Sequence, residues 1–206
     1  VLIPVLVHDP AVPTDPGLAA AVTREVAAFL ARAGMAVSVA PTRTVASAAR
    51  AVTLIDFTEA AAPCDAVGRA LRAVAHPGEI PIVLGGHISS TLALRQLYGV
   101  SCGGRAEDCS APADAGGVVL VDRLNDAEIS LAVVAAHELG HVLGLRHPFE
   151  ADCGATSAPE GAMNLMALER DVDAFRLDRS TVSLGALQLT SAQTATILVA
   201  RNGHPP

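Results

Sequence analysis

Two histidines four residues apart, with a glutamate between them, constrain this chain more than any other feature. His137, Glu138 and His141 lie in a mostly apolar stretch that ends near residue 145. On a helix, side chains four positions apart project from the same face, one turn apart. Both imidazoles can therefore reach one tetrahedral metal ion, which binds histidine nitrogen at about 2.0–2.1 Å. The pattern predicts a helix that carries a metal site, with Glu138 beside the ion but not bound to it.

The residues that follow extend the pattern to a third imidazole. Gly144 comes three residues after His141, and a glycine there can take a positive φ and end the helix in a sharp turn. The chain then doubles back, so that His147 can approach the same ion from outside the helix. Three neutral imidazoles leave one coordination position open, which is typical of a catalytic zinc rather than of a closed structural site. Glu138 is then placed to act as general base for a water that attacks a carbonyl.

This string resembles the HExxHxxGxxH zinc signature of the metzincin clan of metallopeptidases. All five defining positions match, and they are His137, Glu138, His141, Gly144 and His147. The resemblance implies a zinc-dependent endopeptidase that binds one catalytic zinc through the three histidines. It also implies that Glu138 takes a proton from the attacking water and then passes it to the leaving amine.

A second motif resembles the Met-turn of the clan, a tight loop whose methionine faces the zinc-bound imidazoles. Asn164, Leu165 and Met166 match the wording of that turn in several families, so Met166 is preferred to Met163 as its methionine. The resemblance gives Met166 a structural role in packing and no role in proton transfer.

The clan resemblance implies an α+β fold. The upper subdomain would hold a mixed, mostly parallel twisted sheet and two long helices, and the irregular lower subdomain would end in a C-terminal helix. Mapped onto this sequence, residues 1–206 form a single metallopeptidase catalytic domain, with the upper subdomain at about 1–146 and the lower at about 147–206.

The resemblance also implies how substrate binds. An extended peptide would pair with an edge strand of the upper sheet. The S1′ pocket would be formed by the back of the active-site helix and by the residues after the Met-turn, and its candidates are Val134, Ala167, Leu168 and Arg170. Arg170 would favour acidic side chains there.

The metzincin subfamily is left unassigned. Pro148, directly after the third histidine, resembles serralysins, and Cys153 resembles adamalysin-like proteins. The only tyrosine, Tyr98, precedes the zinc motif, so the tyrosine that follows the Met-turn in serralysins has no counterpart.

Periodicity predicts strands alternating with helices in the first half of the chain. Strands are expected at 2–7, 35–39, 52–57, 80–84 and 117–121. The Gly-, Ala-, Asp- and Cys-rich stretch 99–117 is expected to be a loop.

Capping residues locate the helices. Asp15, Pro16 and Gly34 are typical of the start and end of a helix over about 16–33. Capping-box patterns at Asn125/Glu128 and Thr190/Gln193 predict helices that run through His141 and to about Arg201. A short helix is expected at 65–74.

Composition excludes several classes of protein. Hydrophobic residues make up 51% of the 206 residues and charged residues 17%, which excludes a disordered chain. The net charge is −7 and there is no lysine, so we expect neither nucleic acid nor an anionic membrane as partner. No run approaches the ~18 apolar residues of a membrane span. We expect a monomer that binds a peptide or protein substrate.

The four cysteines are evidence for the cellular compartment of the protein. No CxxC occurs among Cys64, Cys102, Cys109 and Cys153, so a cysteine zinc site is not expected. Two disulfides in a secreted or extracytoplasmic protein are favoured, and four thiols in a cytosolic protein are the alternative. Cys102 and Cys109 enclose a short loop, which leaves Cys64 with Cys153 by elimination. The lysine-free, Ala- and Arg-rich composition is typical of a bacterium with a GC-rich genome.

Other polar residues receive simpler interpretations. Asp122, Asp126 and Glu128 fit strand-end and helix-cap roles better than a calcium site, so calcium is not indicated. His76 and His87 are expected to be surface or hydrogen-bonded histidines rather than ligands. The alternative function is a zinc-containing binding or latent domain of the same fold with little turnover. The intact Glu138 argues against it, because such a domain has no chemical need for that carboxylate.

Overall fold

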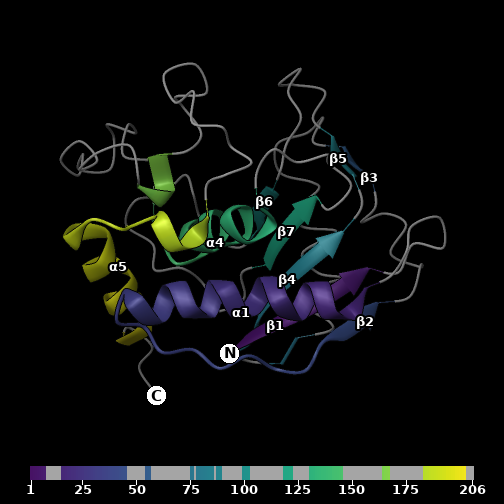
Figure 1. Ribbon diagram of the computed structural model, residues 1–206, viewed down its shortest axis with the longest axis horizontal. Helices are drawn as coiled ribbons and strands as arrows, with labels where there is room; N and C mark the ends of the chain where they lie inside the picture. The colour runs from purple at the N-terminus through teal and green to yellow at the C-terminus, as the bar shows by residue number, and fades with distance from the viewer. Residues whose placement is uncertain are drawn as a thin grey trace.

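The computed structural model describes eleven segments of the chain, and they are residues 1–7, 15–45, 54–56, 75–76, 78–85, 87–89, 99–102, 118–122, 130–145, 164–167 and 183–202. Among these residues a twisted five-stranded sheet packs against two helices (Figure 1). Helix α1 (Pro16–Arg32) contacts the first strand, helix α4 (Leu131–Val142) contacts the strands near the opposite edge, and the two helices contact each other. They therefore cover the sheet side by side.

The sheet is mixed and mostly parallel, as the sequence predicts. Its strand order is β2 (Arg43–Val45), β1 (Leu2–Val7), β4 (Ile80–Gly85), β7 (Val118–Asp122) and β6 (Gly99–Cys102). All neighbours are parallel except β6, which runs antiparallel to β7 at the edge. A separate parallel pair joins β3 (Leu54–Asp56) and β5 (His87–Ser89).

Central strands are buried because they carry uninterrupted apolar runs. In β4, every residue from Pro81 to Gly85 is buried, as expected for a parallel strand with neighbours on both sides. Val119 and Val121 of β7 are fully buried beside it. The strands predicted at 2–7, 80–84 and 117–121 are confirmed within the described residues. The end of β7 at Asp122 also agrees with its expected strand-end role.

Helix α1 begins and ends as its capping residues predict. The Asp15 carboxylate accepts a hydrogen bond from the Gly17 N–H at 2.8 Å, and Pro16 opens the helix. Gly34 follows the last turn with φ +85°. Its N–H donates to Ala31 and the next N–H, of Met35, donates to Leu30. This pair of bonds is a Schellman motif, which satisfies the last carbonyls of the helix.

That motif explains why the strand predicted at 35–39 is wrong. Met35 is buried because it packs against the end of α1 as part of the Schellman motif, not because it alternates in a strand. Only Val39 makes an isolated parallel bridge, to Leu2. The ladder with β1 starts later, at Arg43, where no strand was predicted.

Two other boundaries also need correction. Residues 99–102 form β6 rather than a loop, because pairing with β7 satisfies a backbone whose side chains carry little strand signal. Helix α4 begins at Leu131 after Ser130, not at Asn125, and its buried residues begin at Ala132. Asn125 and Glu128, the helix predicted at 65–74 and all of 103–117 lie outside the described residues.

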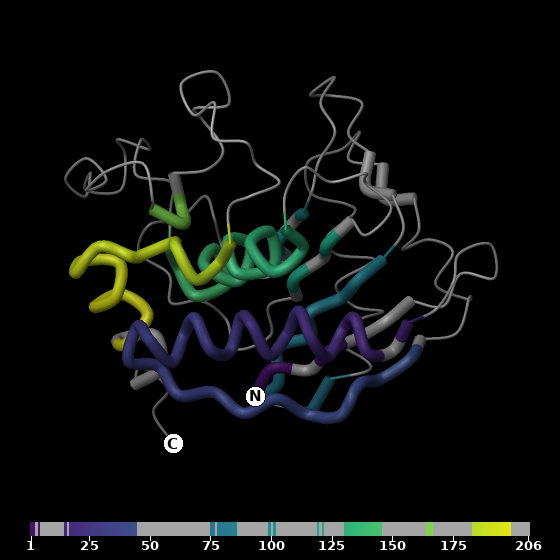
Figure 2. The backbone as a smooth tube through the Cα atoms, viewed as in Figure 1, coloured from purple at the N-terminus to yellow at the C-terminus, as the bar shows by residue number. Residues whose placement is uncertain are grey.

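The C-terminal segment returns to α4. It comprises the 3₁₀ turn η5 (Leu184–Ala186) and helix α5 (Ser191–Asn202). Figure 2 shows this yellow segment beside the green α4, and near it lies the 3₁₀ turn η3 (Leu165–Ala167). None of the described helices is long and apolar enough to cross a membrane.

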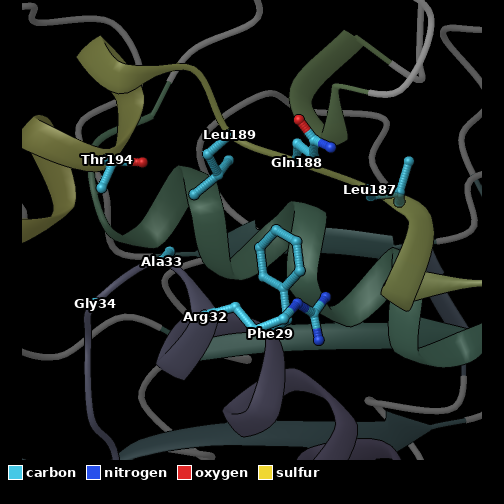
Figure 3. A pocket seen from close by; sticks show the side chains of 8 residues that line it. All are labelled: Phe29, Arg32, Ala33, Gly34, Leu187, Gln188, Leu189 and Thr194. Atoms are coloured by element: carbon cyan, nitrogen blue, oxygen red, sulfur yellow. The ribbon is translucent and has the colours of Figure 1, made fainter.

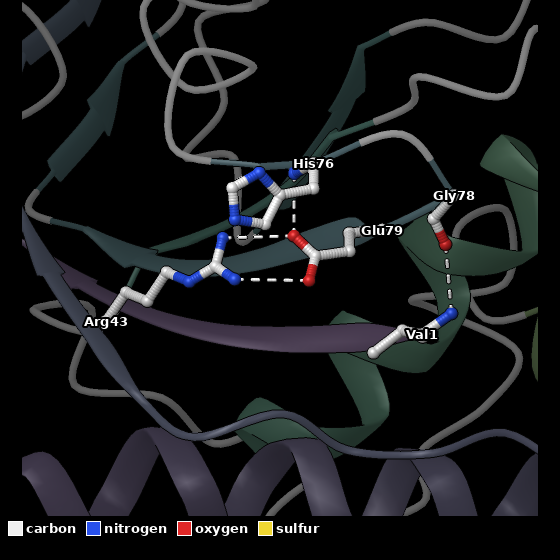
Figure 4. A network of polar contacts seen from close by, with 5 residues as sticks. All are labelled: Val1, Arg43, His76, Gly78 and Glu79. Atoms are coloured by element: carbon white, nitrogen blue, oxygen red, sulfur yellow. Dashed lines mark hydrogen bonds and ion pairs between the residues drawn. The ribbon is translucent and has the colours of Figure 1, made fainter.

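A polar network joins the start of β2 to the residues just before β4 (Figure 4). Arg43, at the start of β2, makes two hydrogen bonds of 3.0 and 3.1 Å to Glu79, just before β4. The backbone N–H of His76 donates to the same carboxylate at 2.6 Å. This N–H and the Arg43 guanidinium lower the pKa of Glu79 below its ordinary value of 4.5. The ion pair therefore clamps β2 to β4 across β1.

Candidate metal centre

Helix α4 carries two imidazoles that face each other. His137 is buried and His141 is half-buried. Their Nε2 atoms lie 3.2 Å apart, and the rings meet edge to face with centroids 4.8 Å apart. The i, i+4 spacing thus brings two nitrogens to one point, as the sequence predicts.

The other nitrogen of each ring is held by a backbone carbonyl. His137 Nδ1 lies 3.0 Å from the Leu165 carbonyl oxygen, and His141 Nδ1 lies 2.9 Å from that of Leu145. A carbonyl oxygen can only accept, so each Nδ1 carries the hydrogen and donates it. A neutral ring with its hydrogen on Nδ1 presents an unprotonated Nε2 to the other ring.

This arrangement fits a metal ion. Two nitrogens bound at about 2.0–2.1 Å in tetrahedral geometry lie about 3.3–3.4 Å apart, close to the 3.2 Å between these Nε2 atoms. Backbone carbonyls on the outer nitrogens are the contacts that metal-binding histidines use to fix their tautomer and orientation. Two facing lone pairs repel each other unless a cation or a proton lies between them.

The end of α4 positions the carbonyl that orients His141. Gly144 has φ +86°, its N–H donates to His141, and the N–H of Leu145 donates to Gly140. These bonds form a second Schellman motif. The turn predicted at Gly144 is confirmed. It also brings the Leu145 carbonyl oxygen within hydrogen-bond distance of His141 Nδ1, a contact that was not predicted from the sequence.

Met166 packs against helix α4 near Gly140, and its assignment to the Met-turn stays a prediction. Its side chain is fully buried in η3. A β-carbon built on Gly140 would lie 2.6 Å from the Met166 sulfur, so any larger residue at this position would require the methionine side chain to shift. The packing role of Gly140, which lies between Glu138 and His141, was not predicted from the sequence.

A buried polar cluster, which we call the amide clamp, joins η3 to α5. Asn164 and Gln193 pair through their side-chain amides, with Nδ2 to Oε1 at 2.7 Å and Nε2 to Oδ1 at 3.3 Å. Gln193 Oε1 also accepts from the Thr190 N–H, and Thr190 Oγ1 accepts from the Gln193 N–H. The capping box predicted at Thr190/Gln193 is thus confirmed, but its contact with Asn164 was not predicted.

Comparison with known families decides the identity of the fold. The sequence pattern of the matrixin family, peptidase family M10, matches residues 55–159, just over half of the chain. The chain belongs to the matrixin family. The metzincin resemblance is therefore confirmed, and a zinc metallopeptidase is supported in general terms.

Solved structures support the same fold. This matrixin superposes on the crystal structure of archaemetzincin from Methanopyrus kandleri with a TM-score of 0.55 and 13% sequence identity. The match covers 98% of this chain and 95% of the other. It confirms the metzincin-like fold. The search of curated proteins found no match for this sequence.

The described residues of this matrixin contain part of the predicted site. Glu138 follows His137 on α4 with a half-buried side chain, and Val134 is buried on the same helix. Ala167 ends η3. Outside the described residues lie His147, Leu168 and Arg170. Among the described residues, no group of three or more His, Cys, Asp or Glu side chains gathers at one point, so this part contributes two of the three predicted ligands.

The cysteines and the subdomain boundary stay predictions. Cys64, Cys109 and Cys153 lie outside the described residues, and the Cys102 side chain is not among those described. The division of the domain at about residue 146 falls next to a segment that is likewise not described.

A separate cavity of about 430 Å³ lies at the end of α1 (Figure 3). Phe29 and Arg32 line one side, with the guanidinium 5.4 Å from the ring centre, and residues 187–189 with Thr194 line the other. Arg32 donates to the Leu184 carbonyl at 3.0 Å, which ties α1 to η5. Neither His137 nor His141 lines this cavity, so it is not the metal centre.

Proposed function

We propose that this matrixin is a zinc-dependent endopeptidase that hydrolyses peptide bonds in peptide or protein substrates. The pair of imidazoles on α4 carries the proposal. Their Nε2 atoms face each other at 3.2 Å while both Nδ1 atoms are fixed on backbone carbonyls. Both rings are therefore oriented as metal ligands.

The chemistry follows from the residues around that pair. When bound by His137, His141 and His147, zinc supplies a Lewis acid that polarises a peptide carbonyl and lowers the pKa of water. Glu138 acts as general base toward the attacking water and then donates the proton to the leaving amine nitrogen. Met166 supports the imidazoles by packing and transfers no proton. Calcium has no part in the proposal.

Substrate would bind along the edge of the sheet. Strand β6 is the outermost strand beside β7, and it contacts α4. A peptide that adds to β6 as a further strand would lie next to the helix that carries the ligands. We place the S1′ pocket at Val134, Ala167, Leu168 and Arg170, with Arg170 favouring acidic side chains.

Removing the Glu138 carboxylate tests the mechanism. Glu138→Ala and the isosteric Glu138→Gln should keep one zinc per chain and lose about 10²–10⁴-fold of peptidase activity, because general-base catalysis contributes that much. The measurements are hydrolysis of an unfolded protein substrate, zinc content by atomic absorption and the melting temperature. The unmodified chain with a chelator is the control.

Two outcomes would contradict the proposal. A Glu138 variant that binds zinc and still hydrolyses substrate at near-normal rates would exclude the general-base role. If the unmodified chain shows no chelator-sensitive hydrolysis, the zinc-containing binding or latent domain becomes the better function.

We also propose a monomer in a secreted or extracytoplasmic bacterial compartment, with Cys102–Cys109 and Cys64–Cys153 disulfides. The even number of cysteines and the lack of a CxxC pair support it. No thiol should then react under denaturing, non-reducing conditions, and light scattering should give the monomer mass. Four reactive thiols would favour the cytosolic alternative.

A further inference from the structure

We propose that Gln193 is a positioning residue of the metal centre, acting through Asn164 and the Leu165 carbonyl on His137. The proposal rests on the function proposed above, because its purpose is to orient a zinc ligand. Gln193 lies on α5, 56 positions from His137 in the sequence, and its side chain is only 4% exposed.

The first link joins His137 to η3. The Leu165 carbonyl accepts from His137 Nδ1 at 3.0 Å, and an acceptor at this nitrogen favours one tautomer and one rotation of the ring. Because Leu165 lies 28 residues from His137, the backbone of α4 cannot hold the acceptor in place. Its position depends on whatever fixes η3.

The second link fixes η3 through Asn164. The Asn164 Oδ1 atom accepts from the Met166 N–H at 2.9 Å and from Gln193 Nε2 at 3.3 Å. Asn164 Nδ2 donates to Gln193 Oε1 at 2.7 Å. One asparagine side chain therefore shapes the turn around the Leu165 carbonyl and attaches it to α5. The Leu165 N–H adds a separate bond to the Gln188 carbonyl at 3.0 Å.

The third link explains why glutamine occupies position 193. A capping box needs only an acceptor at this position, which glutamate supplies equally well. Pairing with Asn164 needs a donor as well, because Oδ1 of Asn164 can only accept. Glutamine meets both needs, and both amides are buried, so an unpaired group there would be costly. Capping α5 requires only the acceptor of Gln193, so the donor that pairs with Asn164 serves a purpose other than the cap.

Two variants separate positioning from stability. Gln193→Met keeps the length of the side chain and removes the amide, whereas Thr190→Ala weakens the cap but leaves the Asn164–Gln193 pair. Both should lower the melting temperature. Gln193→Glu keeps the acceptor of the cap and, when ionised, replaces the donor to Asn164 with a charged acceptor, which provides a second variant for the case in which Gln193→Met does not fold.

Zinc affinity is the first measurement. With the metal alone as probe, Gln193→Met should weaken zinc binding by about 10–100-fold, the loss typical of removing an outer contact of a ligand. Thr190→Ala should change zinc affinity less than about 3-fold, well below that range. Equal affinities in Gln193→Met and the unmodified chain, or equal losses in Gln193→Met and Thr190→Ala, would overturn the proposal.

Histidine NMR on the chelated protein is the second measurement, and it does not depend on the metal. The hydrogen-bonded Nδ1–H signal of His137 should shift or broaden in Gln193→Met and Gln193→Glu, while that of His141 stays unchanged as an internal control. Unchanged His137 signals would overturn the positioning role. An unmodified chain with both signals but no zinc binding would instead contradict the proposed function, so the two failures are distinguishable.

Discussion

The end of α4 and the turn η3 do the same task by different means. His141 donates to a carbonyl four residues ahead, in the turn that Gly144 produces. His137 donates to Leu165, 28 residues ahead in another element. One ligand is therefore oriented by its own stretch of sequence and the other by tertiary structure. Two histidines of one motif therefore depend unequally on the rest of the fold.

The largest expected effect comes from removing either ligand. His137→Ala and His141→Ala should each weaken zinc binding by more than about 100-fold, beyond the loss of an outer contact. In the presence of chelator they should differ, because each variant leaves a carbonyl without its donor but the His137–Leu165 contact is buried and the His141–Leu145 contact only partly so, and the cost of a fully buried unpaired carbonyl is about 1–3 kcal/mol. Zinc competition and urea unfolding of the metal-free variants measure both. Equal metal-free stabilities would contradict the comparison.

Gly140→Ala is expected to have the next largest effect, and it tests the contact between α4 and the turn η3. The added β-carbon would meet the Met166 sulfur at 2.6 Å, so we expect a loss of about 1–3 kcal/mol in the free energy of unfolding from overpacking. Urea titration measures it. The double variant with Met166→Ala should lose less than the two single variants together, since the pair is in contact. Strict additivity would show that this contact does not limit position 140.

Gly144→Ala tests the local side. A β-carbon there meets nothing within 4 Å, but the residue has φ +86°, which costs an L-residue about 1–2 kcal/mol. Gly144→Asn should lose less, because asparagine tolerates this conformation. The free energy of unfolding measures the cost. Histidine NMR should show the change at His141 Nδ1–H and not at His137. A change at His137 alone would contradict the claim that the Gly144 turn orients His141.

The smallest effect should come from Glu79→Gln, outside both regions. The lowered pKa of Glu79 means that the ionised pair with Arg43 stabilises the fold above about pH 4.5, and that this contribution is lost as pH falls through the folded-state pKa. The stability difference between the variant and the unmodified chain should therefore shrink below pH 4.5. Thermal unfolding from pH 7 to 3 measures it, with unchanged zinc affinity as the control. A constant difference would exclude the ion pair as its cause.

Local signals predicted much of the fold. Asp15 and Gly34 bound α1 as expected, Thr190 and Gln193 cap α5, and Gly144 ends α4. Each of these positions acts within one helical turn, where a residue type has a direct physical consequence. The i, i+4 spacing of the ligands is a relation of the same kind.

Relations between distant segments could not be predicted. β6 is a strand because β7 lies beside it, and Met35 is buried because α1 ends there. In the same way, Gly140 was not singled out because its constraint comes from Met166, and the second partner of Gln193 is Asn164. Hydrophobic periodicity does not show which side chain from a distant segment packs against a residue or accepts its hydrogen bond.

The amide clamp has a consequence for the order of events during synthesis. Chains emerge from the amino end at about 5–20 residues per second, so the zinc-motif helix is made seconds before residue 193. Until that residue arrives, the turn that carries the Leu165 carbonyl lacks its side-chain contacts with α5. On the function and the positioning role proposed above, the nascent chain would contain all the residues of the metal centre before the centre is rigid, and peptidase activity would begin only after the last helix docks.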